Sequence, residues 1–167
     1  ERDVLSNLNF KSHKLDIAQN IFPELLKMGA HIYGYQTVEY IKDMGTPDRL
    51  LSVESDIQNK VCSARSEDVN RKAVFLDRDG TINKTAGFIN SPNDIELLDN
   101  VTTAIALLNK SIYLAICVTN QPVIARGDLT LSKLTEIHQK MDTLLGNEGA
   151  YIDRLYYCPH HPHIGYA

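Results

Sequence analysis

The chain has few cysteines, no excess of basic residues and no long apolar run, and each of these absences excludes a class of protein. The 167 residues include three cysteines, Cys62, Cys117 and Cys158. They are too few for a disulfide framework, and an odd number cannot all pair with one another. A formal charge of −4 gives no reason to expect nucleic acid or an anionic membrane as a partner. Because no apolar run is long enough to span a bilayer and residues 1–3 open no signal-peptide pattern, we expect a cytoplasmic protein.

The most informative stretch is 72–83, which reads KAVFLDRDGTIN. Its apolar run predicts a buried strand that ends in a glycine-containing turn. Strand side chains alternate, so Asp77 and Asp79 can point the same way, and a cation between them, with Mg²⁺ favoured by hard oxygen ligands, relieves their repulsion. Such a pair suits phosphoryl transfer, with Asp77 as nucleophile and Asp79 as proton donor and then base for water. The alternative, a calcium loop, requires more acidic residues than 80–82 supply.

The same stretch resembles the DxDGT motif of the haloacid dehalogenase superfamily of phosphatases, and DRDGTIN is similar to one branch of it. That branch includes heptose bisphosphate phosphatases and histidinol-phosphatases. The resemblance implies an α/β, Rossmann-like fold with a parallel sheet, and a magnesium ion held by Asp77 and Asp79. It also implies a phosphorylated sugar as substrate, with histidinol phosphate as the alternative, and Arg78 among the substrate-binding residues.

From residue 72 onward the signals for strands and helices alternate, which predicts a parallel sheet with helices on its faces. We expect strands at 73–76, 113–118 and 151–157. The inward residues of the two helices between them are predicted to be Val101, Ala104, Ile105 and Leu108, after Asn100 as N-cap, and then Leu134, Ile137, Met141 and Leu144. Ligands of such sheets bind at the carboxyl ends of the strands, where the candidate residues fall.

A second candidate cluster follows the second predicted strand, in the sequence VTNQPVIARG. It resembles the second motif of the same phosphatases, in which a hydroxyl binds a phosphate oxygen. The resemblance makes Thr119 catalytic and places Asn120, Gln121 and Arg126 in substrate binding. Capping of the strand end by Thr119, and a solvent-facing Arg126, are the alternatives from the residues themselves. The usual TNQSGIARG is altered here, because proline and valine replace its serine and glycine.

The loop KTAGFI, residues 84–89, occupies the place of a substrate-covering loop in the resembling enzymes. Gly87 and Phe88 match the pattern and are expected to bind substrate. Thr85 and Ala86 depart from the Asp-His often found there, so the loop identifies the substrate less firmly than the aspartates identify the chemistry.

The third cluster, CPHHPH at 158–163, has a thiol and an imidazole two residues apart, which suits zinc. In the resembling proteins Cys158 and His160 would be joined by two later cysteines in a structural Zn²⁺ site. Those cysteines are absent from the sequence. His161 and His163 can replace them, although exposed loop histidines are the preferred interpretation.

Residues 1–57 resemble the end of the catalytic domain of sugar-phosphate nucleotidyltransferases, in which the D-x-G-T aspartate, here Asp43, approaches the metal. Locally, Thr46 is expected to cap a helix that begins at Pro47. Other expected elements are a helix through Ile17, Ile21, Leu25 and Met28 that starts or kinks at Pro23 and stops at Gly29, a strand at 31–38, and a helix with Leu50, Leu51, Val53 and Ile57 on its apolar face.

Together these features predict a bifunctional protein, with the tail of a nucleotidyltransferase at 1–57, a linker at 58–71 and a phosphatase domain at 72–167. Its last motifs, a lysine and a late acidic pair, should follow the zinc loop, yet no Lys, Arg, Asp or Glu follows Arg154. We therefore expect a fragment whose active site is incomplete. A non-catalytic zinc-binding or scaffold module is the alternative from a different functional class.

Overall fold

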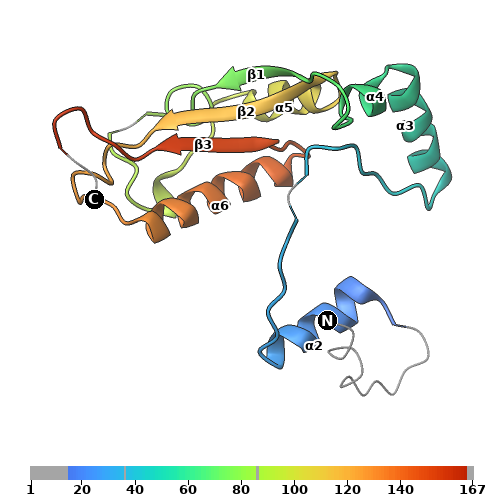
Figure 1. Cartoon of the computed structure of the whole chain (residues 1–167), viewed down its shortest axis with the longest axis horizontal. Helices are drawn as coiled ribbons and strands as arrows, with labels where there is room; N and C mark the ends of the chain where they lie inside the picture. Colours follow the sequence, from blue (N-terminus) through green and yellow to red (C-terminus); the bar gives the residue numbers. More distant parts are fainter. Residues whose placement is uncertain (1–14, 36, 86, 165–167) are drawn as a thin grey trace. The chain divides into compact units, whose positions relative to one another are not determined.

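The computed structural model describes residues 15–35, 37–85 and 87–164. The chain divides into two compact units, Glu1–Gln36 and Thr37–Ala167. The described part of the first unit contains a π-helical turn, Ile17–Ile21, followed by helix α2, Phe22–Lys27 (Figure 1). The predicted start of regular helix near Pro23 is confirmed, because proline is tolerated only in a first turn.

Three parallel strands form the sheet of the second unit, in the order β1-β2-β3 (Figure 1). They are β1, Lys72–Leu76, β2, Tyr113–Asn120, and β3, Arg154–Cys158. Parallel neighbours require crossover connections, and helices supply both of them here. The predicted α/β class with a parallel sheet is confirmed.

The crossover helices are α5, Val101–Asn109, and α6, Leu131–Asn147, and their apolar residues share one core with one face of the sheet. Ile105 of α5 and Ile137 of α6 are buried against Ala115 and Cys117 of β2. Ala104 was predicted to face inward but is exposed. Leu144 is partly buried against the core, as predicted, and Leu145 beside it is fully buried. Asn100 occupies the predicted N-cap position with a left-handed backbone but makes no capping side-chain hydrogen bond.

The opposite face of the sheet is only partly covered within the described residues. Val38 packs on Leu114 and Ile116 at the amino-terminal half of this face. Toward the carboxyl end, three apolar side chains are exposed, with exposed fractions of 71% for Phe75, 46% for Val118 and 57% for Tyr156.

Two of the predictions for residues 31–58 are wrong. Residues 31–35 and 37–38 form no strand and pair with none of β1, β2 and β3. Helix α3, Pro47–Gln58, forms and is capped by Thr46 as predicted, but Val53 alone of its four predicted apolar residues is buried, and Leu51 is 63% exposed. An amphipathic pattern gives the face of a helix; it does not guarantee a partner for that face.

The predicted linker, 58–71, contains a short helix, α4, Val61–Ala64, and a buried arginine. Arg65 donates from Nη1 to Oδ1 of Asp153 at 2.6 Å and from Nη2 to the carbonyl of Tyr113 at 3.4 Å. Asp153 also accepts from the amide of Ala115 at 2.8 Å, so the pair joins α4 to the beginning of β2 and β3. The domain boundary itself stays a prediction.

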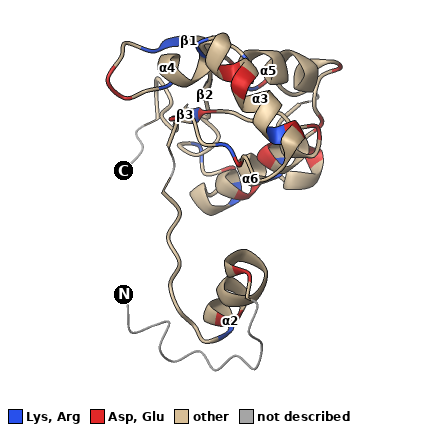
Figure 2. Cartoon of the chain, turned by 90° about the vertical axis from the view of Figure 1, so that its right-hand side faces the viewer, with Lys and Arg blue, Asp and Glu red and all other residues tan. Residues whose placement is uncertain are grey.

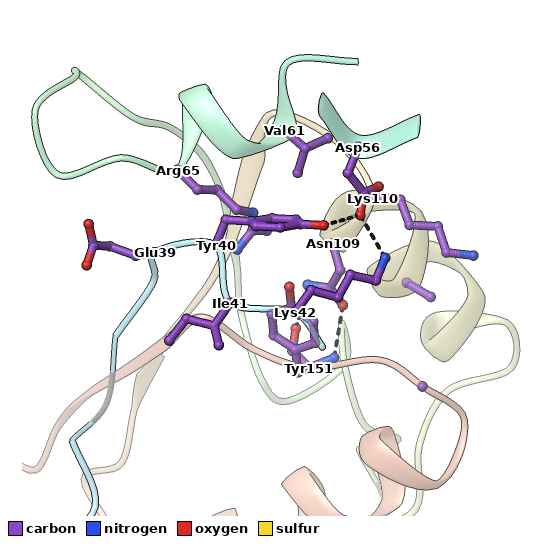
Figure 3. A pocket seen from close by; sticks show the side chains of 12 residues that line it. Glu39, Tyr40, Ile41, Lys42, Asp56, Val61, Arg65, Asn109, Lys110 and Tyr151 are labelled. Carbon is purple, nitrogen blue, oxygen red and sulfur yellow. Dashed lines mark hydrogen bonds and ion pairs between the residues drawn. The ribbon is translucent and has the colours of Figure 1, made fainter. Parts of the chain in front are cut away.

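A cavity of about 300 Å³ lies beside this ion pair and is lined in part by residues 39–42 and α5 (Figure 3). Asp56 accepts hydrogen bonds from Tyr40 Oη and Lys42 Nζ, both at 2.7 Å. Burial, and then the bond to Asp56, raise the pKa of Tyr40. These groups therefore satisfy one another and tie residues 40–42 to helix α3.

Charge is mixed on the second unit: both signs occur along α3 and along α6 (Figure 2). Among the helices described, none combines the length and the apolar character needed to cross a membrane.

Candidate active site

The two aspartates of DRDGTIN leave the sheet at the carboxyl end of β1, but they occupy different environments. Asp77 is exposed, and its Oδ1 accepts from the backbone amide of Arg78 at 2.7 Å. Asp79 lies in a tight turn in which Gly80 has φ +81°, a conformation that favours glycine. The amide of Gly80 closes this turn on the carbonyl of Asn83 at 2.8 Å.

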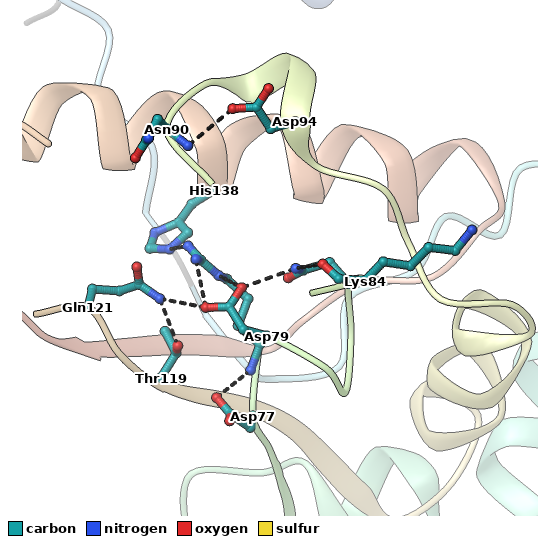
Figure 4. A network of polar contacts seen from close by, with 10 residues as sticks. Asp77, Asp79, Lys84, Asn90, Asp94, Thr119, Gln121 and His138 are labelled. Atoms are coloured by element: carbon teal, nitrogen blue, oxygen red, sulfur yellow. Dashed lines mark hydrogen bonds and ion pairs between the residues drawn. The ribbon is translucent and has the colours of Figure 1, made fainter. Parts of the chain in front are cut away.

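Four N–H groups converge on the carboxylate of Asp79 (Figure 4). Arg78 forms a fork, from Nε to Oδ1 at 3.1 Å and from Nη2 to Oδ2 at 2.9 Å. Asn83 Nδ2 donates to Oδ1 at 3.1 Å, and Gln121 Nε2 donates to Oδ2 at 3.0 Å. Two carboxylate oxygens accept about four hydrogen bonds in total, so the side chain is saturated.

These donors decide the charge of Asp79. Burial raises the pKa of its carboxyl group, but the hydrogen bonds from Arg78, Asn83 and Gln121 and the charge of Arg78 outweigh burial and hold the pKa below its ordinary value. Asp79 is therefore an ionised, oriented carboxylate.

The end of β2 brings the second predicted cluster to the same place. Thr119 is buried, and its Oγ1 accepts from Gln121 Nε2 at 3.0 Å, so one amide group joins Thr119 to Asp79 (Figure 4). The amide of Gln121 donates to the carbonyl of Cys158 at 2.7 Å, which ties this loop to the end of β3. Asn120, predicted to bind substrate, is exposed.

Sequence reasoning missed two members of this network, Asn83 and His138. Asn83 is fully buried and belongs to the DRDGTIN motif, so the motif was the signal that could have found it. His138, on α6, lies 3.2 Å through Nε2 from Nη1 of Arg78. It directly follows the inward residue Ile137, so it flanks the apolar stripe, but only the fold places it over the turn after β1.

His138 makes stability depend on pH. Burial, and then the charge of Arg78, lower its pKa from 6.5 to about 4. Between pH 6.5 and about pH 4, His138 is protonated in the unfolded chain but not in the folded chain. The free energy of unfolding therefore decreases as the pH falls through this window. The loss is about 3 kcal/mol. We expect urea unfolding between pH 7 and pH 4 to show a shallower decline for His138→Gln than for the parent, and an unchanged decline for the exposed control His31→Gln. Equal declines would contradict this.

A pocket of about 160 Å³ opens between the turn after β1 and the loop after β2. Arg126 lies with its guanidinium carbon 5.2 Å from the ring centre of Phe88 and donates from Nε to Asp128 at 2.8 Å. Its Nη2 is buried and has no hydrogen-bond partner among the described residues. All six predicted substrate-binding residues line this pocket, namely Arg78, Gly87, Phe88, Asn120, Gln121 and Arg126.

The other predicted metal ligands, Cys158, His160 and Asp43, do not gather in one site as the predicted substrate residues do. Cys158 Sγ and His160 Nδ1 are 3.6 Å apart at the exposed carboxyl end of β3. Asp43 is exposed, accepts from the amide of Gly45 at 2.9 Å and pairs with Arg49. Across the described residues no group of three or more His, Cys, Asp or Glu side chains is arranged to hold a metal ion.

For magnesium, the two aspartates fit unequally. The exposed carboxylate of Asp77 suits a cation that binds through one or two carboxylates, water and substrate phosphate. The carboxylate of Asp79, with four donors on it, has no lone pair left for a metal in this arrangement.

Known phosphatases resemble this chain in sequence and in structure. No family model matches the chain. D-glycero-beta-D-manno-heptose-1,7-bisphosphate 7-phosphatase of Photorhabdus laumondii is 43% identical over 90 residues, which are 54% of this chain and 48% of that protein. The enzyme of the same name from Escherichia coli K12 is 41% identical over 90 residues, 54% of this chain and 47% of its own length. The chain thus spans about half the length of the curated relatives it matches.

Solved structures match over the same share of the chain. The crystal structure of D,D-heptose 1,7-bisphosphate phosphatase from B. bronchiseptica, complexed with magnesium and phosphate, has a TM-score of 0.53 and 36% identity over 57% of this chain and 54% of that one. A putative HAD-like phosphatase from Mesorhizobium loti also has a TM-score of 0.53 and 36% identity, over 55% and 44%. The parallel sheet and its two crossover helices therefore have the fold of haloacid dehalogenase-type phosphatases.

Proposed function

We propose that the complete protein containing this chain is a phosphoric monoester hydrolase that removes the 7-phosphate of D-glycero-D-manno-heptose 1,7-bisphosphate. One observation carries the proposal: Asp77, Asp79 and Thr119 meet at the carboxyl ends of two adjacent parallel strands. The names and identities of the relatives support the same activity.

In the proposed reaction, an Oδ of Asp77 attacks phosphorus while the bond from phosphorus to the sugar oxygen breaks. Asp79 gives the leaving oxygen a proton, and then takes one from the water that attacks phosphorus in the aspartyl-phosphate. The four donors keep Asp79 ionised in the free protein. Asp79 is therefore already in the protonation state that it needs as the base for water. The first role requires that Asp79 take up a proton as substrate binds. Thr119 is assigned to a phosphate oxygen.

We assign a magnesium ion to Asp77 on the strength of its exposed carboxylate; bound there, the ion would neutralise charge on the transferring phosphoryl group. A structural zinc ion would use Cys158 and His160, whose sulfur and nitrogen atoms already lie side by side. Two further ligands are needed, so we expect this chain alone to bind zinc weakly.

Arg126 favours a bisphosphate over histidinol phosphate. Arg126 and Asp79 line the same pocket, and the buried Nη2 of Arg126 has no hydrogen-bond partner among the described residues. An unpaired buried donor is costly unless a ligand satisfies it. A second phosphate on the substrate supplies the acceptor. Histidinol phosphate has no second phosphate, and its amine is a cation, which Arg126 repels.

Replacing Arg126 by Met should therefore discriminate between the two substrates. We expect kcat/KM for the heptose bisphosphate to fall by about 10-fold to 100-fold, since one charge-assisted hydrogen bond is lost. Histidinol phosphate hydrolysis should fall little or rise. The test is steady-state kinetics on both substrates with an extended chain, meaning one that also contains the expected lysine and acidic-pair motifs. Lys133→Met, on the exposed face of α6, is the control. A parent enzyme that prefers histidinol phosphate would replace the proposed substrate by the alternative.

We further propose that residues 1–57 belong to a sugar-phosphate nucleotidyltransferase domain, with Asp43 near its metal, joined through 58–71 to the phosphatase at 72–167. The phosphatase product, heptose 1-phosphate, is the kind of substrate that such a domain converts to a nucleotide sugar for surface polysaccharide, in the cytoplasm. The alternative function is a non-catalytic zinc-binding or scaffold module. It is disfavoured because such a module does not require an oriented Asp79 carboxylate beside an exposed Asp77.

A further inference from the structure

His138 lies behind the proposed active site rather than in it. It belongs to α6, whereas the aspartates follow β1 and Thr119 ends β2. Its ring is 9% exposed, and Arg78 between it and Asp79 is 2% exposed. Neither the sequence motifs nor the relatives' names give His138 a role.

The contact between His138 and Arg78 fixes the state of the histidine. A guanidinium group has five donors and no acceptor, so at 3.2 Å the Nε2 atom of His138 must be the acceptor of the Nη1 hydrogen bond. The ring is therefore neutral, with its hydrogen on Nδ1. Burial beside a cation agrees with this assignment.

The same contact fixes the orientation of Arg78. Its guanidinium group is planar, so an acceptor on Nη1 and a fork on Nε and Nη2 hold it in one plane and one rotation. The acceptor itself is immobile, because Ile137 and Met141 on the same helix are fully buried in the core. Tyr157 of β3, with its ring centre 5.8 Å from that of His138, flanks the imidazole.

We propose that His138 is a positioning residue, which holds the Arg78 fork on Asp79 and thereby orients the Asp79 carboxylate for its reaction with water. The proposal rests on the proposed function. Without an acceptor at this position, Nη1 would be a buried donor without a partner, and Arg78 would rotate toward another acceptor. Asp79 would then lose two of its four donors and its fixed orientation.

Three variants separate positioning from packing. His138→Leu removes the acceptor at similar volume. His138→Gln restores it, since the Oε1 of Gln is the same number of bonds from Cα as Nε2 of His. Ile137→Val removes a buried methyl group beside His138 and touches no part of the Arg78 contact, so it controls for loss of stability. If His138→Leu does not fold, His138→Asn, whose oxygen stops one bond short, takes its place.

Two readouts are needed. The first is hydrogen exchange of the Arg78 Nε–H group, observed by NMR in this chain. We expect slow exchange in the parent, in His138→Gln and in Ile137→Val, and exchange at least about 10-fold faster in His138→Leu, because opening of the buried fork controls exchange. The second is turnover in an extended chain. There kcat should fall about 10-fold to 100-fold in His138→Leu with KM unchanged, and His138→Gln should restore most of it.

Unchanged Arg78 exchange in His138→Leu would overturn the proposal, as would a kcat no lower than that of Ile137→Val. Absence of turnover in every protein, parent included, would instead refute the proposed function. In that case the exchange measurement would still decide whether His138 positions Arg78.

Discussion

Replacing Asp77 by Asn in an extended chain is expected to abolish phosphate release, with a loss on the order of 10⁴-fold or more, because the substitution removes a nucleophile. The amide keeps the shape of the side chain but does not attack phosphorus. Asp77 is exposed and accepts a hydrogen bond from the backbone amide of Arg78, so folding should be almost unaffected. Release of inorganic phosphate from the heptose bisphosphate measures the effect.

The matched control for this variant is Asp68→Asn, which makes the same chemical change at an exposed position of the segment before β1. It should retain full activity and the same melting temperature. If Asp77→Asn kept more than about one hundredth of the parent activity, a carboxylate at position 77 would not be the nucleophile.

Replacing Arg65 by Met is expected to lower the free energy of unfolding by about 3–5 kcal/mol, because it removes the cation from a buried ion pair. The side chains of Arg65 and Asp153 are 4% and 2% exposed and 2.6 Å apart, so solvent does little to replace the lost partner. Urea unfolding of this chain followed by circular dichroism measures the change.

The surface pair Lys133–Glu136, with side chains 42% and 48% exposed, is the control for that experiment. Lys133→Met should cost less than about 1 kcal/mol, since exposed pairs contribute little. The double variant Arg65→Met with Asp153→Asn should recover part of the loss, because it leaves no buried charge behind. If Arg65→Met and Lys133→Met lowered the free energy of unfolding equally, the ion pair of Arg65 would not stabilise the second unit, Thr37–Ala167.

Local pattern was sufficient to predict the sheet and its helices. Ala115 and Cys117 alternate with Leu114 and Ile116 in a run that is apolar throughout, as expected of a strand covered on both faces. All four predicted inward positions of α6 pack in or against the core. Leu145 was not predicted although it is more deeply buried than its neighbour Leu144, because packing decides how far each residue beside the apolar stripe is covered.

The region before β1 was predicted less well because its structure depends on contacts far along the chain. Arg65 reads as part of a polar linker, and only its distance from Asp153, 88 residues later, makes it a core residue. Residues 31–35 have β-branched and aromatic side chains, but a strand also requires a neighbour with which to pair, and sequence pattern does not supply one.

The candidate site shows the same division. The DRDGTIN and VTNQ motifs placed Asp77, Asp79, Thr119 and Gln121 together, because strand ends share one edge of the sheet. The motifs did not reveal that donors saturate the carboxylate of Asp79. Two of the four donors come from Arg78, which contacts His138 of α6, and one comes from the buried Asn83. Which acid receives the phosphoryl group is thus the question on which the account depends.

Location of the phosphorylated aspartate answers it most directly. An extended chain carrying Asp79→Asn, in which hydrolysis of the intermediate should slow, is mixed with a labelled phosphate ester whose leaving group needs no protonation and is quenched in acid within milliseconds. Such a substrate is required because the substitution also removes the proton donor for the leaving oxygen. Reduction of the acyl-phosphate with borohydride then converts the modified aspartate to homoserine, and peptide sequencing locates it. The account predicts homoserine at position 77. Labelled phosphoenzyme in Asp77→Asn, or homoserine at position 79 of the parent enzyme, would contradict it.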